Sequence, residues 1–201
     1  MNQELKNKFI SILKSTKREG ILNLIEYLEN GDFFVAPAST RYHNSFEGGL
    51  LKHSLDVYLN LSYLYKSYSR KYPTLPKIEN DSLKIVGLLH DICKADTYVE
   101  GFRWGKNDKN EWIKIPEYKK DAILQMGHGA KSIFILQNFI GLSVYEATAI
   151  YWHMGAYDIS AYSTVNELGF NYADNLLAFL LNHADMFTTY ITENENYFKE
   201  E

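Results

Sequence analysis

The sequence predicts an all-α helical bundle with one small β-hairpin inserted into it, and three observations support this fold class. Apolar residues recur at helical spacing through most of the 201 residues. Only four prolines and twelve glycines interrupt the chain. One segment, residues 97–115, instead has two short strand-like runs around a polar turn. A mass of 23.3 kDa fits a single domain over residues 1–201.

The first half of the chain predicts helices separated by one irregular segment. Residues 3–29 carry two amphipathic helices, broken near Lys17–Gly20. Residues 33–49 contain a proline and a glycine pair, which favour an irregular approach to a helix from Leu50 to about Ser69. Asn80 or Asp81 is expected to cap the start of a further helix, which runs to about Cys93. Because this last helix is apolar nearly all round, we expect it at the centre of the fold.

The second half returns to helices after the inserted hairpin. We expect strands on both sides of Gly105–Asn110 and a helical pattern again after Pro116. One helix is predicted from about Ala130 to Phe139. Another starts at Ser143, whose spacing from Glu146 has the form of a capping box, and ends near Gly155. The last helix covers roughly residues 172–191.

Composition excludes several classes of protein. The apolar fraction of 46% is too high for a disordered chain. A net charge of −4 argues against wrapping of duplex nucleic acid. A single cysteine excludes an internal disulfide, and the chain shows neither a signal-peptide core nor a membrane-spanning apolar run, so we expect a cytoplasmic protein. The many tyrosines and phenylalanines would suit a homodimer interface or a well-filled core.

Polar residues in apolar helices are the first sign of chemistry. His90 and Asp91 end the most apolar predicted helix, where an ionisable pair is costly to bury unless a strong partner satisfies it. His53 lies in a separate helix, and Asp185 lies in a third apolar one. If these helices pack together, imidazoles and carboxylates can hold a divalent cation and leave positions for water. Each residue alone is more typical of a helix cap or a satisfied polar group.

The order of these residues resembles the HD-domain superfamily of metal-dependent phosphohydrolases, whose signature is a His, a His-Asp pair and a distal Asp. His53, His90-Asp91 and Asp185 match it, over about residues 40–190. His128 and His153 fall where the two-metal branch has further ligands. The chain has Cys93 where the family often has Gly, and we interpret it as a small core residue. No Gly-Tyr-Pro sequence occurs, which disfavours cyclic di-GMP as the substrate.

The resemblance implies a site with two divalent cations. His53, His90, Asp91 and Asp185 would hold one, and Asp91 would bridge to a second held by His128 and His153. Two cations about 3.5–4 Å apart activate a water and stabilise both oxygens of an in-line phosphoryl displacement. Asp91 is thereby the central catalytic residue. Manganese, iron, nickel, zinc, cobalt and magnesium are not distinguished by such ligands.

Lysines and arginines near the site are candidates for substrate phosphate. Lys94 lies three residues after Asp91, about one helical turn, and either binds a phosphate oxygen in catalysis or is a solvated lysine at a helix end. Lys131 follows His128 at the same spacing and carries the same two interpretations. Arg41, in the irregular approach to the first ligand helix, is a third candidate.

Other residues are open between substrate contact and structure. His43 contacts substrate with Arg41 or supports its loop. In the hairpin, Arg103 is a candidate for substrate binding, whereas Trp104 and Trp112 are expected to pack the hairpin onto the helices. His183 lies about 200° from Asp185 on a helix, so we expect it off the ligand face. Two residues just past His153 are candidates for the rim of the site: Tyr157 and Asp158.

Three functions follow from these observations. The first is a two-metal phosphohydrolase that cleaves a phosphate ester or phosphodiester of a nucleotide or short nucleic acid. The second is a one-metal (deoxy)nucleotide phosphatase or triphosphohydrolase, with His128 and His153 in phosphate binding or proton transfer. The third is a non-catalytic nucleotide-binding module that keeps the metal ligands. All three expect a phosphorylated small molecule or nucleotide as partner.

Overall fold

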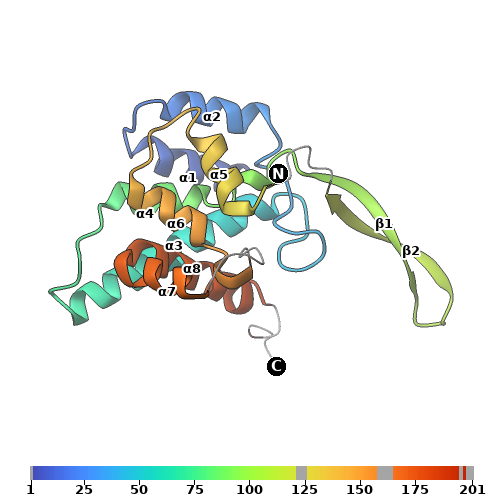
Figure 1. The fold of residues 1–201 in the computed structure, drawn as a ribbon. Helices are drawn as coiled ribbons and strands as arrows, with labels where there is room; N and C mark the ends of the chain where they lie inside the picture. Colours follow the sequence, from blue (N-terminus) through green and yellow to red (C-terminus); the bar gives the residue numbers. More distant parts are fainter. Residues whose placement is uncertain (1, 121–125, 158–164, 195–196, 198–201) are drawn as a thin grey trace.

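The computed structural model describes residues 2–120, 126–157, 165–194 and 197. It is mostly helical, with one antiparallel hairpin that extends away from the helices (Figure 1). The prediction of a helical fold with an inserted hairpin is therefore confirmed. None of the described helices has both the length and the apolar content needed to cross a bilayer.

The first helices form as their apolar spacing predicts. They are α1 (Gln3–Lys14), α2 (Ile21–Asn30) and α3 (Gly49–Lys71). Asn2 caps α1 by accepting hydrogen bonds from the first backbone N–H groups. Between α2 and α3 the chain is irregular and packs Phe33 and Phe34 into the core. This irregular segment brings residues 41–44 to the amino-terminal end of α3.

The helix α4 (Asn80–Leu89) is buried along most of its length and packs against α3. It ends earlier than predicted, because the backbone leaves the helical region at Asp91 and continues as a short 3₁₀ turn, η1 (Ile92–Lys94). A Cβ atom at Gly87 would lie 2.8 Å from the Cα of Tyr58 in α3. Glycine at this position therefore allows the close approach of α3 and α4 just before His90.

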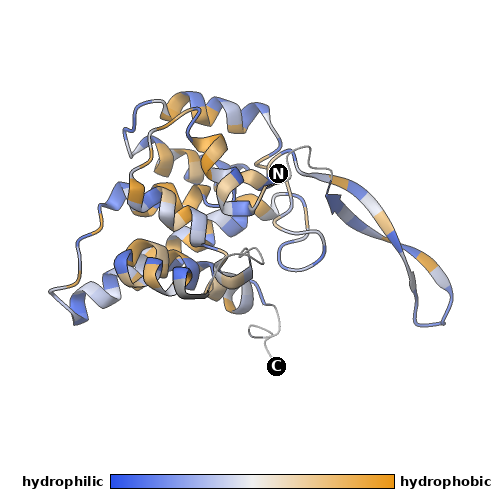
Figure 2. Cartoon of the chain, in the orientation of Figure 1, coloured by the Kyte–Doolittle hydropathy of each residue, from blue (hydrophilic) through white to orange (hydrophobic). Residues whose placement is uncertain are grey.

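The hairpin consists of β1 (Tyr98–Lys106) and β2 (Trp112–Lys120) and is longer than the predicted 97–115. The expectation of helical structure directly after Pro116 is wrong, since this residue pairs with Phe102 inside the hairpin. A two-stranded sheet has only edge strands, so a proline that lacks an N–H group is tolerated there. Figure 2 shows apolar and polar residues mixed along both strands.

The hairpin tryptophans do not pack onto the helices as expected. Trp104 is 58% exposed and Trp112 is 66% exposed. Lysine ammonium groups lie over the aromatic faces instead, with Lys114 Nζ 5.7 Å from the Trp104 ring and Lys106 Nζ 5.5 Å from the Trp112 ring. The hairpin is thus an arm whose aromatic residues contact its own lysines.

The remaining helices complete the bundle. They are α5 (His128–Leu136), α6 (Val144–Trp152), α7 (Val165–Asp174) and α8 (Leu176–Phe187), with a short 3₁₀ turn, η2 (Gly155–Tyr157), after α6 and a π-helical turn, η3 (Thr188–Thr192), after α8. The capping box predicted at Ser143 is present. The single last helix expected over 172–191 is wrong, because Asn175 starts a new helix by accepting from Leu177 N and Ala178 N.

The packing of the bundle brings helix ends together. Helix α8 packs against α3 and α6, and α5 packs against α6 and η1. A Cβ atom at Gly129 would lie 2.6 Å from the carbonyl oxygen of Ile150, so glycine allows α5 to approach α6 beside His128. Leucine, isoleucine and alanine side chains fill the space between these helices.

Candidate metal centre and substrate cavity

The six residues predicted as metal ligands come from separate elements, mostly at helix ends. His53 is the fifth residue of α3, and His128 is the first residue of α5. His90 and His153 directly follow α4 and α6, and Asp91 comes next after His90. Asp185 lies in the last turn of α8. The fold brings all six to one region.

Asp91 lies at the centre of this group, and its two carboxylate oxygens face different histidines. Oδ2 lies 3.5 Å from His90 Nε2 and 3.7 Å from His53 Nε2. Oδ1 lies 3.4 Å from His153 Nε2 and 3.9 Å from His128 Nδ1. A carboxylate in this position can bind one cation through each oxygen.

Several buried polar atoms of the group form no hydrogen bond. They are His53 Nε2, His90 Nε2, Asp91 Oδ1, His128 Nδ1 and His153 Nε2. Buried nitrogen and oxygen atoms are normally satisfied, and leaving one unpaired costs about 1–3 kcal/mol. Five unpaired atoms directed at one region are the arrangement expected of a metal-binding site.

The donor set fits divalent cations. Among the described residues, ligand atoms lie within 4.8 Å of one another in four groups, which are His43–His53–Glu193, His53–His90–Asp185, His90–Asp91–His153 and Asp91–Cys93–His128. Imidazole and carboxylate ligands suit first-row transition metals. The overlap at His90 and at Asp91 allows neighbouring cations to share ligands.

The outer nitrogens of two histidines are held by backbone carbonyls. His90 Nδ1 lies 3.1 Å from the carbonyl oxygen of Gly87, and His153 Nδ1 lies 2.6 Å from that of Ile150. A carbonyl only accepts, so Nδ1 carries the proton in both rings and Nε2 presents its lone pair to the centre. Such outer hydrogen bonds orient metal-binding imidazoles.

The charges of the group compensate one another in the metal-free chain. Burial raises the pKa of Asp91, but the Lys94 ammonium and the neighbouring histidines outweigh it and hold that pKa well below its usual range. Lys94 Nζ lies 2.7 Å from Asp91 Oδ2, and this carboxylate raises the lysine pKa against the effect of burial. Burial lowers the pKa of His90 to about 4, which favours the neutral imidazole that a metal requires.

His53 lies between two carboxylates. Its Nε2 is 3.2 Å from Asp185 Oδ1, and its Nδ1 is 3.0 Å from Glu193 Oε1. Burial lowers the His53 pKa, but the two carboxylates outweigh burial and raise it to about 10. Without a metal this ring therefore keeps both protons at neutral pH, and a cation at Nε2 would replace one of them.

A cavity of about 700 Å³ opens onto the group. Its polar lining includes Asp91, Lys94, His153, Asn182 and Asp185. Apolar and aromatic side chains form its walls, namely Tyr42, Met154, Tyr157, Met186 and Tyr190. Cavities of this size, with apolar walls and a few convergent polar groups, hold small organic ligands.

The four residues predicted to bind substrate differ in their placement. Lys94 lines the cavity, and its ammonium is buried against Asp91. Lys131 Nζ donates to Thr97 Oγ1 at 3.0 Å and does not line the cavity. Arg41 is exposed and lies against the Tyr42 ring, and Arg103 lies in the hairpin arm, 3.8 Å from Glu117. The structure thus brings only Lys94 of these four to the cavity.

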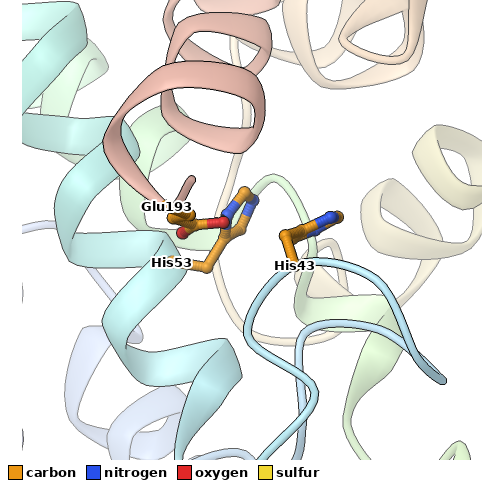
Figure 3. Close-up of side chains that lie close together, drawn as sticks. All are labelled: His43, His53 and Glu193. Carbon is orange, nitrogen blue, oxygen red and sulfur yellow. The ribbon is translucent and has the colours of Figure 1, made fainter. Parts of the chain in front are cut away.

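Two cavity residues were missed or left open by the sequence. Glu193 was missed, because it follows the predicted last helix in a polar run without helical periodicity. His43 was left open between loop and substrate; its ring lies 5.1 Å from that of His53, and its Nε2 is buried without a hydrogen-bond partner. Figure 3 shows the Glu193 carboxylate against the His53 ring, with His43 beside it.

The other candidates lie as follows. Tyr157 lines the cavity, whereas Asp158 is outside the described residues. His183 is exposed and contacts Phe179, away from the ligands, as expected. Cys93 is buried, and its backbone N–H donates to Ser132 Oγ at 3.3 Å.

Comparison with known proteins gives one distant relative. A dihydroneopterin 2',3'-cyclic phosphate phosphodiesterase from Methanocaldococcus jannaschii is 30% identical over 100 residues. The match covers 49% of this chain and 37% of the relative, so the chain spans little more than a third of that protein. No family model matches the chain, and no solved structure matches it significantly. The chain is therefore similar over half its length to a phosphodiesterase, and it carries buried His and Asp groups able to hold a metal ion.

Proposed function

We propose that this protein is a divalent-metal-dependent phosphohydrolase of the HD type that hydrolyses a phosphodiester or phosphate ester of a nucleotide. The observation that carries the proposal is the placement of Asp91, with two histidines at each carboxylate oxygen and unpaired buried nitrogens on both sides. The similarity to a phosphodiesterase supports the same class of reaction.

The ligand roles follow from this placement. His53, His90 and Asp185 with Asp91 Oδ2 would hold one cation, and His128 and His153 with Asp91 Oδ1 would hold a second. Two such cations supply an activated water and stabilise the attacking and leaving oxygens of an in-line displacement. The protein fixes the ligands in advance, because the outer nitrogens of His90 and His153 are already held by backbone carbonyls.

Lys94 and the cavity would bind the substrate. If Asp91 binds a cation, Lys94 no longer has to compensate the carboxylate charge. Its ammonium can then bind a phosphate oxygen at the cavity wall. The aromatic residues Tyr42, Tyr157 and Tyr190 provide faces against which a planar base can stack. A ring carrying a phosphodiester therefore suits the cavity, and a cyclic phosphodiester, as in the relative's name, is one such substrate.

The experiment is metal analysis and turnover on the same protein and on Asp91→Ala. We expect about two metals per chain, their loss in the variant, and hydrolysis of nucleoside 2',3'-cyclic phosphates or of bis(p-nitrophenyl) phosphate after loading with manganese. Asp91→Ala should abolish turnover while circular dichroism shows an unchanged helical content. Turnover that persists in this variant would refute the proposal.

A one-metal nucleotide phosphatase is the second candidate, and the position of His128 favours it. This side chain is 29% exposed and lies farther from Asp91, at 3.9 Å, than the other three histidines. If the protein binds one metal, His128→Ala should lower the rate of phosphate release from a mononucleotide and leave the metal content unchanged. If it binds two, the same variant should lose one metal.

A further inference from the structure

Glu193 holds the outer nitrogen of His53 at a buried position. Its side chain is 0% exposed, and Oε1 lies 3.0 Å from His53 Nδ1 (Figure 3). Asn44 Nδ2 donates to the same oxygen at 2.7 Å. Because an ionised carboxylate only accepts, His53 Nδ1 must donate, and Nε2 then faces Asp185 and Asp91.

The acceptor at His53 Nδ1 differs in kind from those at His90 and His153. His90 and His153 follow helix ends, where the last carbonyls have no partner within the helix and can accept from Nδ1. His53 instead lies inside α3, as its fifth residue, where the backbone carbonyls accept from the helix itself. The acceptor for its Nδ1 comes from elsewhere in the fold, since Glu193 Oε1 lies 3.0 Å away.

The π-helical turn η3 brings Glu193 to this point. The backbone N–H of Glu193 donates to the carbonyl oxygen of Thr188, five residues earlier, at 2.9 Å. Asn60 in α3 stabilises this turn through two hydrogen bonds. Its Nδ2 donates to Thr188 Oγ1 at 2.8 Å and to Thr192 Oγ1 at 3.2 Å. Asn60 follows His53 by seven residues, about two helical turns, so both side chains leave the same face of α3.

The same segment of chain therefore approaches His53 from both sides. Asp185 in α8 lies at Nε2, and Glu193 after η3 lies at Nδ1. Continued as an α-helix, the chain would carry residue 193 about 12 Å along the axis from residue 185, at 1.5 Å per residue. The wider π turn changes this course, and such turns occur frequently at functional sites.

We propose that Glu193 is a positioning residue, which holds His53 with Nδ1 protonated and Nε2 directed at the metal, and that Asn60 places Glu193 through η3. This rests on the proposed metal site. It assigns a role in metal binding to Asn60, whose side-chain amide donates to Thr188 and Thr192 and not to a proposed ligand. Outer partners of this kind typically change metal affinity by about 10–100-fold.

The test is the dissociation constant for Mn²⁺, measured by calorimetry on the full chain. We expect Glu193→Ala to weaken binding by about 10–100-fold. Glu193→Gln keeps an acceptor oxygen without the charge and should weaken binding less. Asn60→Ala should weaken it by several fold, and Glu26→Gln, an exposed glutamate on α2, serves as the matched control with an unchanged constant.

A spectroscopic measurement separates positioning from other roles. In Zn²⁺-loaded wild type, the ¹H–¹⁵N spectrum of the histidine rings should show a slowly exchanging Nδ1 proton on His53, which Glu193→Ala removes. An unchanged Mn²⁺ constant and an unchanged His53 signal in Glu193→Ala would overturn the proposal. Loss of one bound metal per chain in Glu193→Gln would also overturn it, because Glu193 would then be a ligand. Wild type that binds Mn²⁺ without hydrolysing any substrate would refute the proposed function alone.

Discussion

Lys94 would have one role in the metal-free protein and another once the proposed site binds a metal. Its side chain is 8% exposed and forms an ion pair with Asp91, so it neutralises a carboxylate that burial would otherwise penalise. In the proposed site, a cation bound by Asp91 would compensate the carboxylate charge instead. The Lys94 ammonium would then be available to bind a substrate phosphate at the cavity wall.

We expect Lys94→Met to lower kcat by about 100-fold, the effect of removing one group that stabilises charge in the transition state. Metal affinity should be retained or increased, because a competing cation has been removed. Steady-state kinetics on Mn²⁺-loaded protein, with metal analysis of the same sample, measures both quantities. An unchanged kcat would mean that Lys94 only balances Asp91.

At the scale of residues, the sequence identified the His and Asp side chains that lie together, but of the four residues expected to bind substrate only Lys94 lines the cavity. A His-Asp pair at the end of an apolar helix is costly to bury without a partner, which makes it visible in a sequence. Glu193 carries no such signal, because it lies in a polar run that looks solvated. Its position depends on a π turn and on hydrogen bonds from Asn60, which join α3 to the segment after α8 and are therefore not visible in the local sequence.

At the scale of helices and strands, the buried Glu146 carboxylate connects the start of α6 to the loop after α1. It is 1% exposed and binds Arg18 through both oxygens, at 2.7 and 3.0 Å. Ser82 Oγ and the backbone N–H of Ser143 donate to it as well. Burial raises the pKa of Glu146, but the hydrogen bonds from Arg18 and the two serines outweigh it and leave the pKa below its ordinary value.

Glu146→Gln should lower the free energy of unfolding by about 2–3 kcal/mol at pH 7, because Arg18 loses its charged partner. A lowered carboxyl pKa stabilises the fold above the ordinary value of 4.5, and this contribution is lost as the pH falls through the folded pKa. The difference between wild type and variant should therefore shrink below about pH 4.5. Urea unfolding at several pH values measures it, and a constant difference would contradict the assignment.

We expect the large side chains of the hairpin arm to contribute less to the free energy of unfolding than the buried side chains of the helices. Trp104→Ala and Trp112→Ala should each change the free energy of unfolding by less than about 0.5 kcal/mol, since both side chains are mostly exposed. Leu88→Ala, a fully buried residue of α4, should cost about 2–5 kcal/mol. Urea titrations of the three variants compare these sites. A large loss in either tryptophan variant would show that the arm packs against the body in solution.

The ends of helices and strands were predicted well where a local sequence pattern sets them. They were predicted poorly where contacts between residues far apart in the sequence set them. Ser143 and Glu146 form the expected capping box, which is a local pattern. The last helix was expected to be continuous, because a single Asn inside an apolar run is a weak signal, yet Asn175 caps α8 and also donates to the carbonyl of Tyr145. Pro116 was read as the end of the hairpin, although a proline on an edge strand can continue it.

At the scale of the whole molecule, metal binding at the proposed site would be coupled to folding. The proposed ligands come from α3, α5 and α8 and from the ends of α4 and α6, so cations bound by them would stabilise the folded chain and not the unfolded one. Free metal at 100 times its dissociation constant adds about 2.7 kcal/mol, which for a chain of this size raises Tm by about 5–10 °C.

Thermal unfolding with and without a chelator checks this expectation. Wild type should lose about 5–10 °C on removal of the metal, in line with the same estimate. Asp91→Ala should show no difference between the two conditions. A wild-type Tm that does not respond to manganese, zinc or iron would contradict metal binding at this site.

The single thiol, Cys93, follows the central carboxylate by two residues and is 4% exposed. Burial raises its pKa to about 12, so the folded protein holds almost no thiolate, the form that reacts with disulfide reagents. Reaction of the native protein with such a reagent should therefore depend on local opening of the chain around the candidate metal centre. The rate at which Cys93 is modified would then report how often this region opens, and a bound cation should slow the reaction.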